Sequence, residues 1–167
     1  MDSSNTSGIL RECKRIEEDS TYSAKGHFEA ANFWSRIQFI LGGLAAILTG
    51  VAGALAFNDL GLLAGSIAMF TAALTSFLTF LNPSERQRTH LMAGNDYKEL
   101  QNQARLFREV ELVSTSEIRQ KEEKIKRLAD QRNRLNQRSP QIPRSAFEKA
   151  RIGIEQGESE YSVDKRI

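Results

Sequence analysis

Two long apolar runs lie back to back in the middle of the chain. The first, Ile37 to Phe57, reads IQFILGGLAAILTGVAGALAF, and the second, Leu60 to Leu81, reads LGLLAGSIAMFTAALTSFLTFL. As helices, each run reaches about 31 Å, close to the thickness of the hydrocarbon core of a bilayer. Only Asn58 and Asp59 separate them, and this turn-forming pair lets the helices run antiparallel. The sequence therefore predicts an all-α membrane protein built on a two-helix transmembrane hairpin that is continuous with, or flanked by, long cytoplasmic helices.

Charge is nearly absent from this stretch and dense on either side of it. Between Arg36 and Glu85 the one charged residue is Asp59, at the turn. The alternative is a helical hairpin buried in a soluble bundle, but soluble helices carry a polar stripe with charges. Neither run has one. The charged first thirty residues argue against a secretory signal peptide, and the single cysteine, Cys13, excludes an internal disulfide or a cysteine zinc cluster.

Helical patterns fill both charged flanks. We expect an amphipathic cytoplasmic helix over 1–36, the hairpin over 37–81 with its loop at 58–59, a cytoplasmic helical region over 82–157, and a disordered tail over 158–167. The expected apolar faces carry Ile9, Cys13, Ile16, Ser20, Ser23, His27, Ala30 and Trp34, then Tyr97, Leu100, Ala104, Phe107 and Val110, then Ile125, Leu128 and Leu135. Ser114 with Glu117, and Ser145 with Glu148, have capping-box spacing.

Basic residues near the ends of the apolar runs predict their orientation. Lys25 and Arg36 precede the first run, Arg86, Arg88 and Lys98 follow the second, and the connecting loop has no basic residue. Because basic residues favour the cytoplasmic side, both termini are expected in the cytoplasm of a multi-pass inner-membrane protein.

Small and hydroxyl side chains recur along the two runs. Small residues at four-residue steps predict close helix packing, either within the hairpin or between subunits of a homo-oligomer; they are Gly42, Ala46, Gly50, Ala54, Gly61 and Gly65. Thr71, Thr75 and Thr79 form a second stripe, which serves either packing or the lining of a water-filled path. No ionisable group lies within either run, which argues against proton-coupled transport or a channel with a charged filter.

Sequence signals for catalysis are missing. The chain has no phosphate-binding loop, dinucleotide fingerprint, nucleophile elbow or zinc-protease motif. The two histidines, His27 and His90, lie in different flanks and meet only if those flanks pack together, and a pair of histidines is a weak metal signal. We therefore expect no enzymatic activity, no catalytic residue, no metal site and no cofactor.

Several of these residues together resemble a known family. A charged helix with Tyr22, His27 and Trp34, two spans rich in small residues, and then Asn82, Pro83, His90, Tyr97 and Leu100 follow the pattern of the SLATT family over residues 8 to 155. Members of that family are two-transmembrane effectors of bacterial conflict systems. The resemblance implies an antiviral defence effector that oligomerises, breaches the inner membrane and stops cell growth when a partner is activated. The implied partner is a nucleotide cyclase, a nucleotide sensor or a reverse transcriptase encoded nearby.

Three functions remain open from the sequence. The first is the oligomeric pore-forming or membrane-disrupting effector, the second is a non-lytic membrane anchor or scaffold for a cytoplasmic partner, and the third is a membrane-bound enzyme. The last eighty-odd residues carry a basic surplus, but their charges alternate in sign, which is typical of a solvated helix and disfavours direct nucleic-acid binding.

Overall fold

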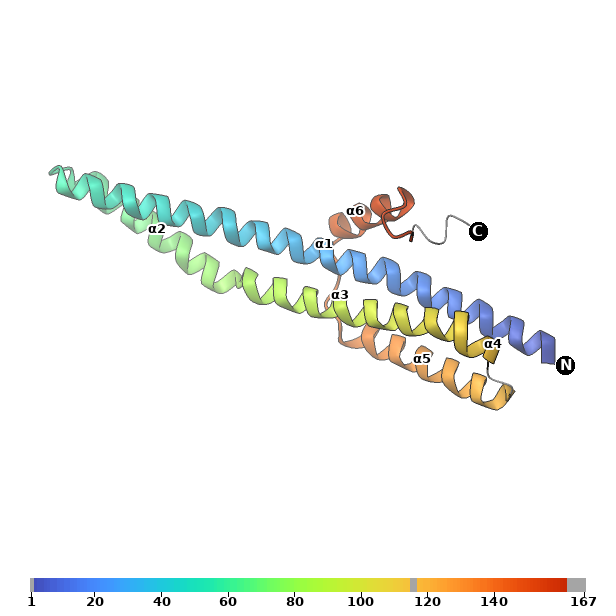
Figure 1. Cartoon of the computed structure of the whole chain (residues 1–167). Helices are drawn as coiled ribbons and strands as arrows, with labels where there is room; N and C mark the ends of the chain where they lie inside the picture. Colours follow the sequence, from blue (N-terminus) through green and yellow to red (C-terminus); the bar gives the residue numbers. More distant parts are fainter. Residues whose placement is uncertain (1, 115–116, 162–167) are drawn as a thin grey trace. The chain divides into compact units, whose positions relative to one another are not determined.

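The computed structural model describes residues 2–114 and 117–161, and among these it is helical throughout, with no strand (Figure 1). Its contacts divide the chain into two units. Met1–Ala30 and Thr89–Ile167 form the first, which we call the bundle, and Ala31–Arg88 form the second, which we call the hairpin unit. The prediction of an all-α chain with two helices long and apolar enough to cross a membrane is confirmed.

The longest helix runs through both units without a break. The helices are α1 Asp2–Phe57, α2 Gly61–Leu81, α3 Pro83–Leu106, a π-helical turn η1 Phe107–Glu111, α4 Leu112–Ser114, α5 Ile118–Arg138 and α6 Arg144–Glu155. Of the two expected arrangements, α1 has the continuous one, since the expected cytoplasmic segment over 1–36 and the first apolar run form one helix. Nothing interrupts the backbone there, because the change at that point is in polarity and not in helix propensity.

Two left-handed residues end the apolar helices. After α1, Asp59 has φ 57, and the Asn58 side-chain amide donates to the Ala54 carbonyl at 2.8 Å. After α2, Asn82 has φ 45, and Pro83 then begins α3. Asn and Asp tolerate this conformation better than other residues with a Cβ, and proline fits the first turn of a helix. The second apolar helix starts at Gly61, one residue later than expected.

The bundle core contains most of the residues on the apolar faces expected from the sequence, but Val110 is 54% exposed. Fully buried side chains include Cys13, Ile16 and Ser20 of α1, Leu100 and Ala104 of α3, and Leu128 and Leu135 of α5. Burying each large aliphatic side chain stabilises the fold by roughly 1.5 to 3 kcal/mol. Small residues let α1 and α3 approach closely: a Cβ added at Gly94 would lie 2.7 Å from the Phe28 ring.

The π-helical turn changes which residues of this stretch face the core. The Leu112 amide donates to the Phe107 carbonyl five residues earlier, and both side chains are buried, at 2% and 6% exposure. A regular helix would place residues five apart about 140° apart around its axis, so the wider turn brings both onto the core side.

The predicted capping boxes are wrong. Helix α5 begins after Glu117 and α6 after Pro143, and neither N-cap makes a side-chain capping bond. Ser145 already lies inside α6, because Pro143, with φ −57, supplies a backbone ready to enter the helix.

Part of the expected disordered tail contacts the bundle. Glu158 pairs with Lys25, and the Tyr161 ring lies under the Arg105 guanidinium at 4.7 Å. Residues 162–167, where most of that prediction falls, lie outside the described residues.

Candidate functional site

The surface of the hairpin unit is apolar almost all round. Its largest side chains are among the most exposed in the molecule: Phe39 83%, Phe57 91%, Leu62 87% and Phe80 88%. A water-soluble monomer rarely exposes a continuous apolar surface of this size. By length and composition both helices can cross a bilayer.

The glycines of the two runs take no part in packing within the hairpin unit. A Cβ built at Gly42, Gly50, Gly61 or Gly65 meets no atom within 4 Å. The buried residues of the two apolar runs are instead Ala52, Ala64 and Thr71. The small-residue faces singled out in the sequence, which include the exposed Ala46 and Ala54, are therefore left open by the single chain.

The threonine stripe satisfies its own donors. Thr71, Thr75 and Thr79 each donate their hydroxyl to the carbonyl four residues earlier, at 2.8, 2.8 and 3.0 Å. Ser66 and Ser76 do the same. This bonding makes a hydroxyl tolerable in hydrocarbon. Thr71 is buried and the other two threonines are exposed, so the stripe turns from the hairpin contact to the outer surface along its length.

An arginine and a tryptophan mark the end of the apolar helices next to the chain's charged segments. The Arg86 guanidinium lies 4.9 Å from the centre of the Trp34 indole, and its Nε donates to the Leu81 carbonyl at 2.9 Å. Phe33 contacts Trp34 edge-on, with ring centres 5.5 Å apart. Arg86 thus bonds a carbonyl left open by the end of α2 while covering an aromatic ring of the type enriched at membrane interfaces.

The two histidines meet inside the bundle. The Nδ1 atoms of His27 and His90 lie 2.9 Å apart, and their side chains are 1% and 5% exposed. The Tyr97 ring stacks on His27 with centres 5.5 Å apart, and its hydroxyl donates to the Asn136 side chain at 2.8 Å. Burial, followed by the proximity of His90, lowers the pKa of His27 from 6.5 to about 4. Burial also raises the pKa of Tyr97.

The residues that carry the family resemblance fall in both units. Tyr22, His27, His90 and Tyr97 belong to the bundle, where Tyr22 also contacts Phe147 with ring centres 6.4 Å apart. The remaining ones, Trp34, Asn82 and Pro83, belong to the hairpin unit.

A partly buried ion pair in the bundle has no clear sequence signal. Arg108, in the π-helical turn, donates to both carboxylate oxygens of Glu17, at 2.7 and 3.1 Å. These residues are 91 positions apart, and no local spacing connects them. The hydrogen bond that Arg108 donates to Glu17 raises the pKa of Arg108 above its usual value. Burial, followed by Glu17, raises the pKa of Cys13 to about 11, so its thiol stays protonated and unreactive at neutral pH.

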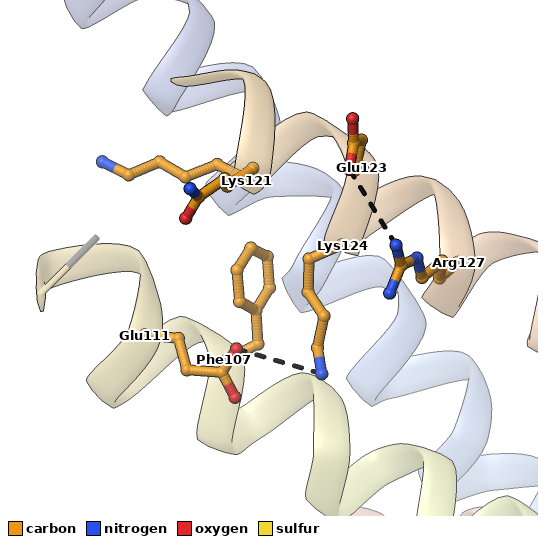
Figure 2. A pocket seen from close by; sticks show the side chains of 7 residues that line it. Phe107, Glu111, Lys121, Glu123, Lys124 and Arg127 are labelled. Atoms are coloured by element: carbon orange, nitrogen blue, oxygen red, sulfur yellow. Dashed lines mark ion pairs between the residues drawn. The ribbon is translucent and has the colours of Figure 1, made fainter. Parts of the chain in front are cut away.

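A charged hollow of about 240 Å³ opens beside the π-helical turn (Figure 2). Lys124 lies 3.9 Å from Glu111, and Arg127 lies 3.9 Å from Glu123, with Phe107 at the base. Its charges are largely paired with one another, so it lacks the isolated, convergent polar groups of a ligand pocket.

Metal-binding groups and similar proteins give no further indication of function. Among residues 2–114 and 117–161, no three or more His, Cys, Asp or Glu side chains are grouped to hold a metal ion. No family model, curated protein or solved structure matches the chain.

Proposed function

We propose that this chain is a multi-pass effector of the bacterial inner membrane that acts in antiviral defence by self-association of its hairpin. The observation that carries the proposal is the open space at Gly42, Gly50, Gly61 and Gly65, where a built Cβ has no atom of another helix within 4 Å. In lipid, helices associate through small residues that let backbones approach, so these faces suit a second copy of the chain. The resemblance to the SLATT family supports the same function.

Assembly would disrupt the membrane or form a pore and so arrest growth or kill the cell. The exposed Thr75 and Thr79 are candidates for lining such a pore, since each keeps acceptor lone pairs after bonding its own helix. Catalysis, a metal or a cofactor has no part in this proposal.

We place both termini in the cytoplasm, because Arg36, Arg86 and Arg88 flank the runs on the side opposite the Asn58–Asp59 turn. Fusions of a reporter that is active only in the cytoplasm test this topology. Activity at both termini and none at the turn is expected, and the reverse pattern contradicts it.

The bundle is proposed as the control element. It would hold the hairpin inactive until an activating partner encoded nearby, a nucleotide cyclase, nucleotide sensor or reverse transcriptase, signals infection. The bundle and the hairpin unit are connected by one unbroken helix, because α1 belongs to both units.

Regulated expression in a bacterium loaded with a membrane-potential dye tests the function. Induction together with the activating partner is expected to depolarise the membrane and stop growth. Replacing Gly42, Gly50, Gly61 and Gly65 with leucine should abolish both effects while the protein still fractionates with membranes. The control variant Ile47→Leu changes an exposed position of the same run, 66% exposed, without changing its side-chain volume, and should stay active. Unchanged potential and growth for the native chain would contradict the proposal.

A second candidate is a non-lytic anchor that holds the bundle at the membrane for a cytoplasmic partner. The hydrophobic core of the bundle favours this anchor function. A partner could bind the surface of the bundle without any change in the hairpin. An anchor should keep its membrane localisation and partner binding in the four-leucine variant, with no change in membrane potential for either chain.

A further inference from the structure

The histidine pair is an unusual element in the core of the bundle. Its Nδ1 atoms are 2.9 Å apart and both side chains are more than nine-tenths buried. A hydrogen bond between two imidazole nitrogens needs one N–H and one lone pair. A hydrogen bond across this gap therefore requires a single proton between the rings, with one Nδ1 protonated and the other unprotonated.

The groups around His27 give its positive charge little support. From α3 it faces His90 and the stacked Tyr97 ring, and α5 contributes Asn136, which accepts from Tyr97. Asp96 of α3 and Arg138 of α5 are paired with each other at 2.6 Å.

The charged residues two positions before and two positions after His27 on α1 are also paired. Lys25 contacts Glu158, and Glu29 contacts Lys149 at 2.5 Å. The effects on His27 come from burial and from His90, and both favour its neutral form.

We infer that the His27–His90 pair is a proton-binding latch, which holds α1 against α3 while one proton lies between the rings and releases them when both Nδ1 atoms are protonated. In the doubly protonated pair, two N–H groups point at each other across 2.9 Å. The hydrogen bond is lost, and two like charges are confined where water does not reach.

Release at this point would act on the two helices that connect the bundle to the hairpin unit. His27 lies on α1, which continues into the first apolar run, and His90 lies on α3, which follows the second. A role in controlling the hairpin rests on the proposed function. The latch itself does not, and it can be tested without any measurement of membrane activity.

Nitrogen NMR of the full chain in detergent micelles, labelled only at histidine, tests the protonation states. The chain has two histidines, so every signal belongs to this pair. At a pH of about 7.5 we expect one protonated and one unprotonated Nδ1, with a slowly exchanging N–H between them. On acidification, one ring should remain neutral well below its ordinary pKa. Two rings that titrate together near 6.5, with rapidly exchanging protons, overturn the latch.

Hydrogen exchange of the same preparation tests release. Protection of α1 amides between residues 9 and 30, corrected for intrinsic rates, should fall about tenfold or more between pH of about 7.5 and about 4.5. His90→Asn can either donate to or accept from His27 and never carries a charge, so it should keep its protection in acid. Tyr97→Phe is the matched control: it removes the bond to Asn136 and should still release in acid. Equal release in His90→Asn and the native chain contradicts the proposal, and should His90→Asn fail to fold, the nitrogen spectra decide.

Discussion

The bundle and the hairpin unit share helix α1, yet large apolar residue types that are buried in the bundle are exposed in the hairpin unit. Phe107 and Leu100 of the bundle are 2% and 0% exposed, whereas Phe80 and Leu62 of the hairpin unit are 88% and 87% exposed. In water, apolar area is stabilising only where it is buried. In hydrocarbon that driving force is absent, and packing depends on close approach of backbones instead.

Glycine shows the same difference. Gly94 of the bundle lies so close to the Phe28 ring that a Cβ has no room, while a Cβ at Gly50 of the hairpin unit would meet no atom of another helix within 4 Å. In the bundle a glycine permits a contact already made, and in the hairpin unit it leaves a surface open. The comparison teaches that glycine serves a contact within the single chain in the bundle, whereas the glycines of the hairpin unit leave space for lipid or for another helix.

The largest expected effect is on core packing. Phe107→Ala should destabilise the bundle by about 3 to 5 kcal/mol, because it removes a buried aromatic ring and leaves a cavity. Thermal unfolding followed by circular dichroism in micelles measures it. The matched substitution Phe80→Ala, at an exposed position, should leave the bundle transition unchanged, and equal losses would break the comparison.

Next in size is a charge placed in the second apolar run. Met69 is 77% exposed, and Met69→Arg should make the free energy of membrane insertion less favourable by about 2.5 to 3.5 kcal/mol. The reason is that an arginine near the centre of a span must leave water. The carbonate-resistant membrane fraction measures insertion. Val113→Arg, on the bundle and 82% exposed, should be neutral. Full insertion of Met69→Arg would count against the membrane span.

Acid should weaken the bundle through His27. Its pKa is about 4 in the folded chain and 6.5 when unfolded, so the neutral form stabilises the fold. That contribution, about 3 kcal/mol, is complete above pH 6.5 and is lost as the pH falls towards 4. Denaturant unfolding across this window should show the slope in the native chain and a smaller one in His27→Gln. Parallel slopes in the two chains would contradict it.

The smallest expected effects come from valine substitutions at the two glycines compared above. Gly94→Val should destabilise the bundle by about 1 to 3 kcal/mol, because the added side chain must displace the Phe28 ring. Gly50→Val should leave the bundle's unfolding transition in place and instead reduce association of the chain in micelles, read by analytical ultracentrifugation. If Gly50→Val leaves association intact, that face is not the contact between copies.

Much of the fold follows from local sequence patterns. The absence of charge between Arg36 and Glu85 marks the apolar helices, and Asn82 with Pro83 marks the end of the second. The buried faces of α3 and α5 follow the three- and four-residue steps of Tyr97, Leu100, Leu128 and Leu135. Helix capping was less predictable, because the residue that ends or starts a helix depends on where the whole chain turns.

Contacts between distant segments could not be read in this way. The Arg108–Glu17 pair joins residues 91 positions apart, and the π-helical turn that presents Arg108 has no sequence signature of its own. The meeting of His27 and His90 was open in the sequence, conditional on the flanks packing together.

The sequence by itself determined that this chain is helical and that its middle is too apolar for water, because backbone hydrogen bonding and side-chain polarity act over a few neighbouring residues. Only the tertiary structure decided that two imidazole nitrogens lie 2.9 Å apart in the core and that the glycines of the apolar runs have open space beside them. Those facts depend on which helix faces lie within a few ångströms of each other, and distance in space is set by packing of the whole fold.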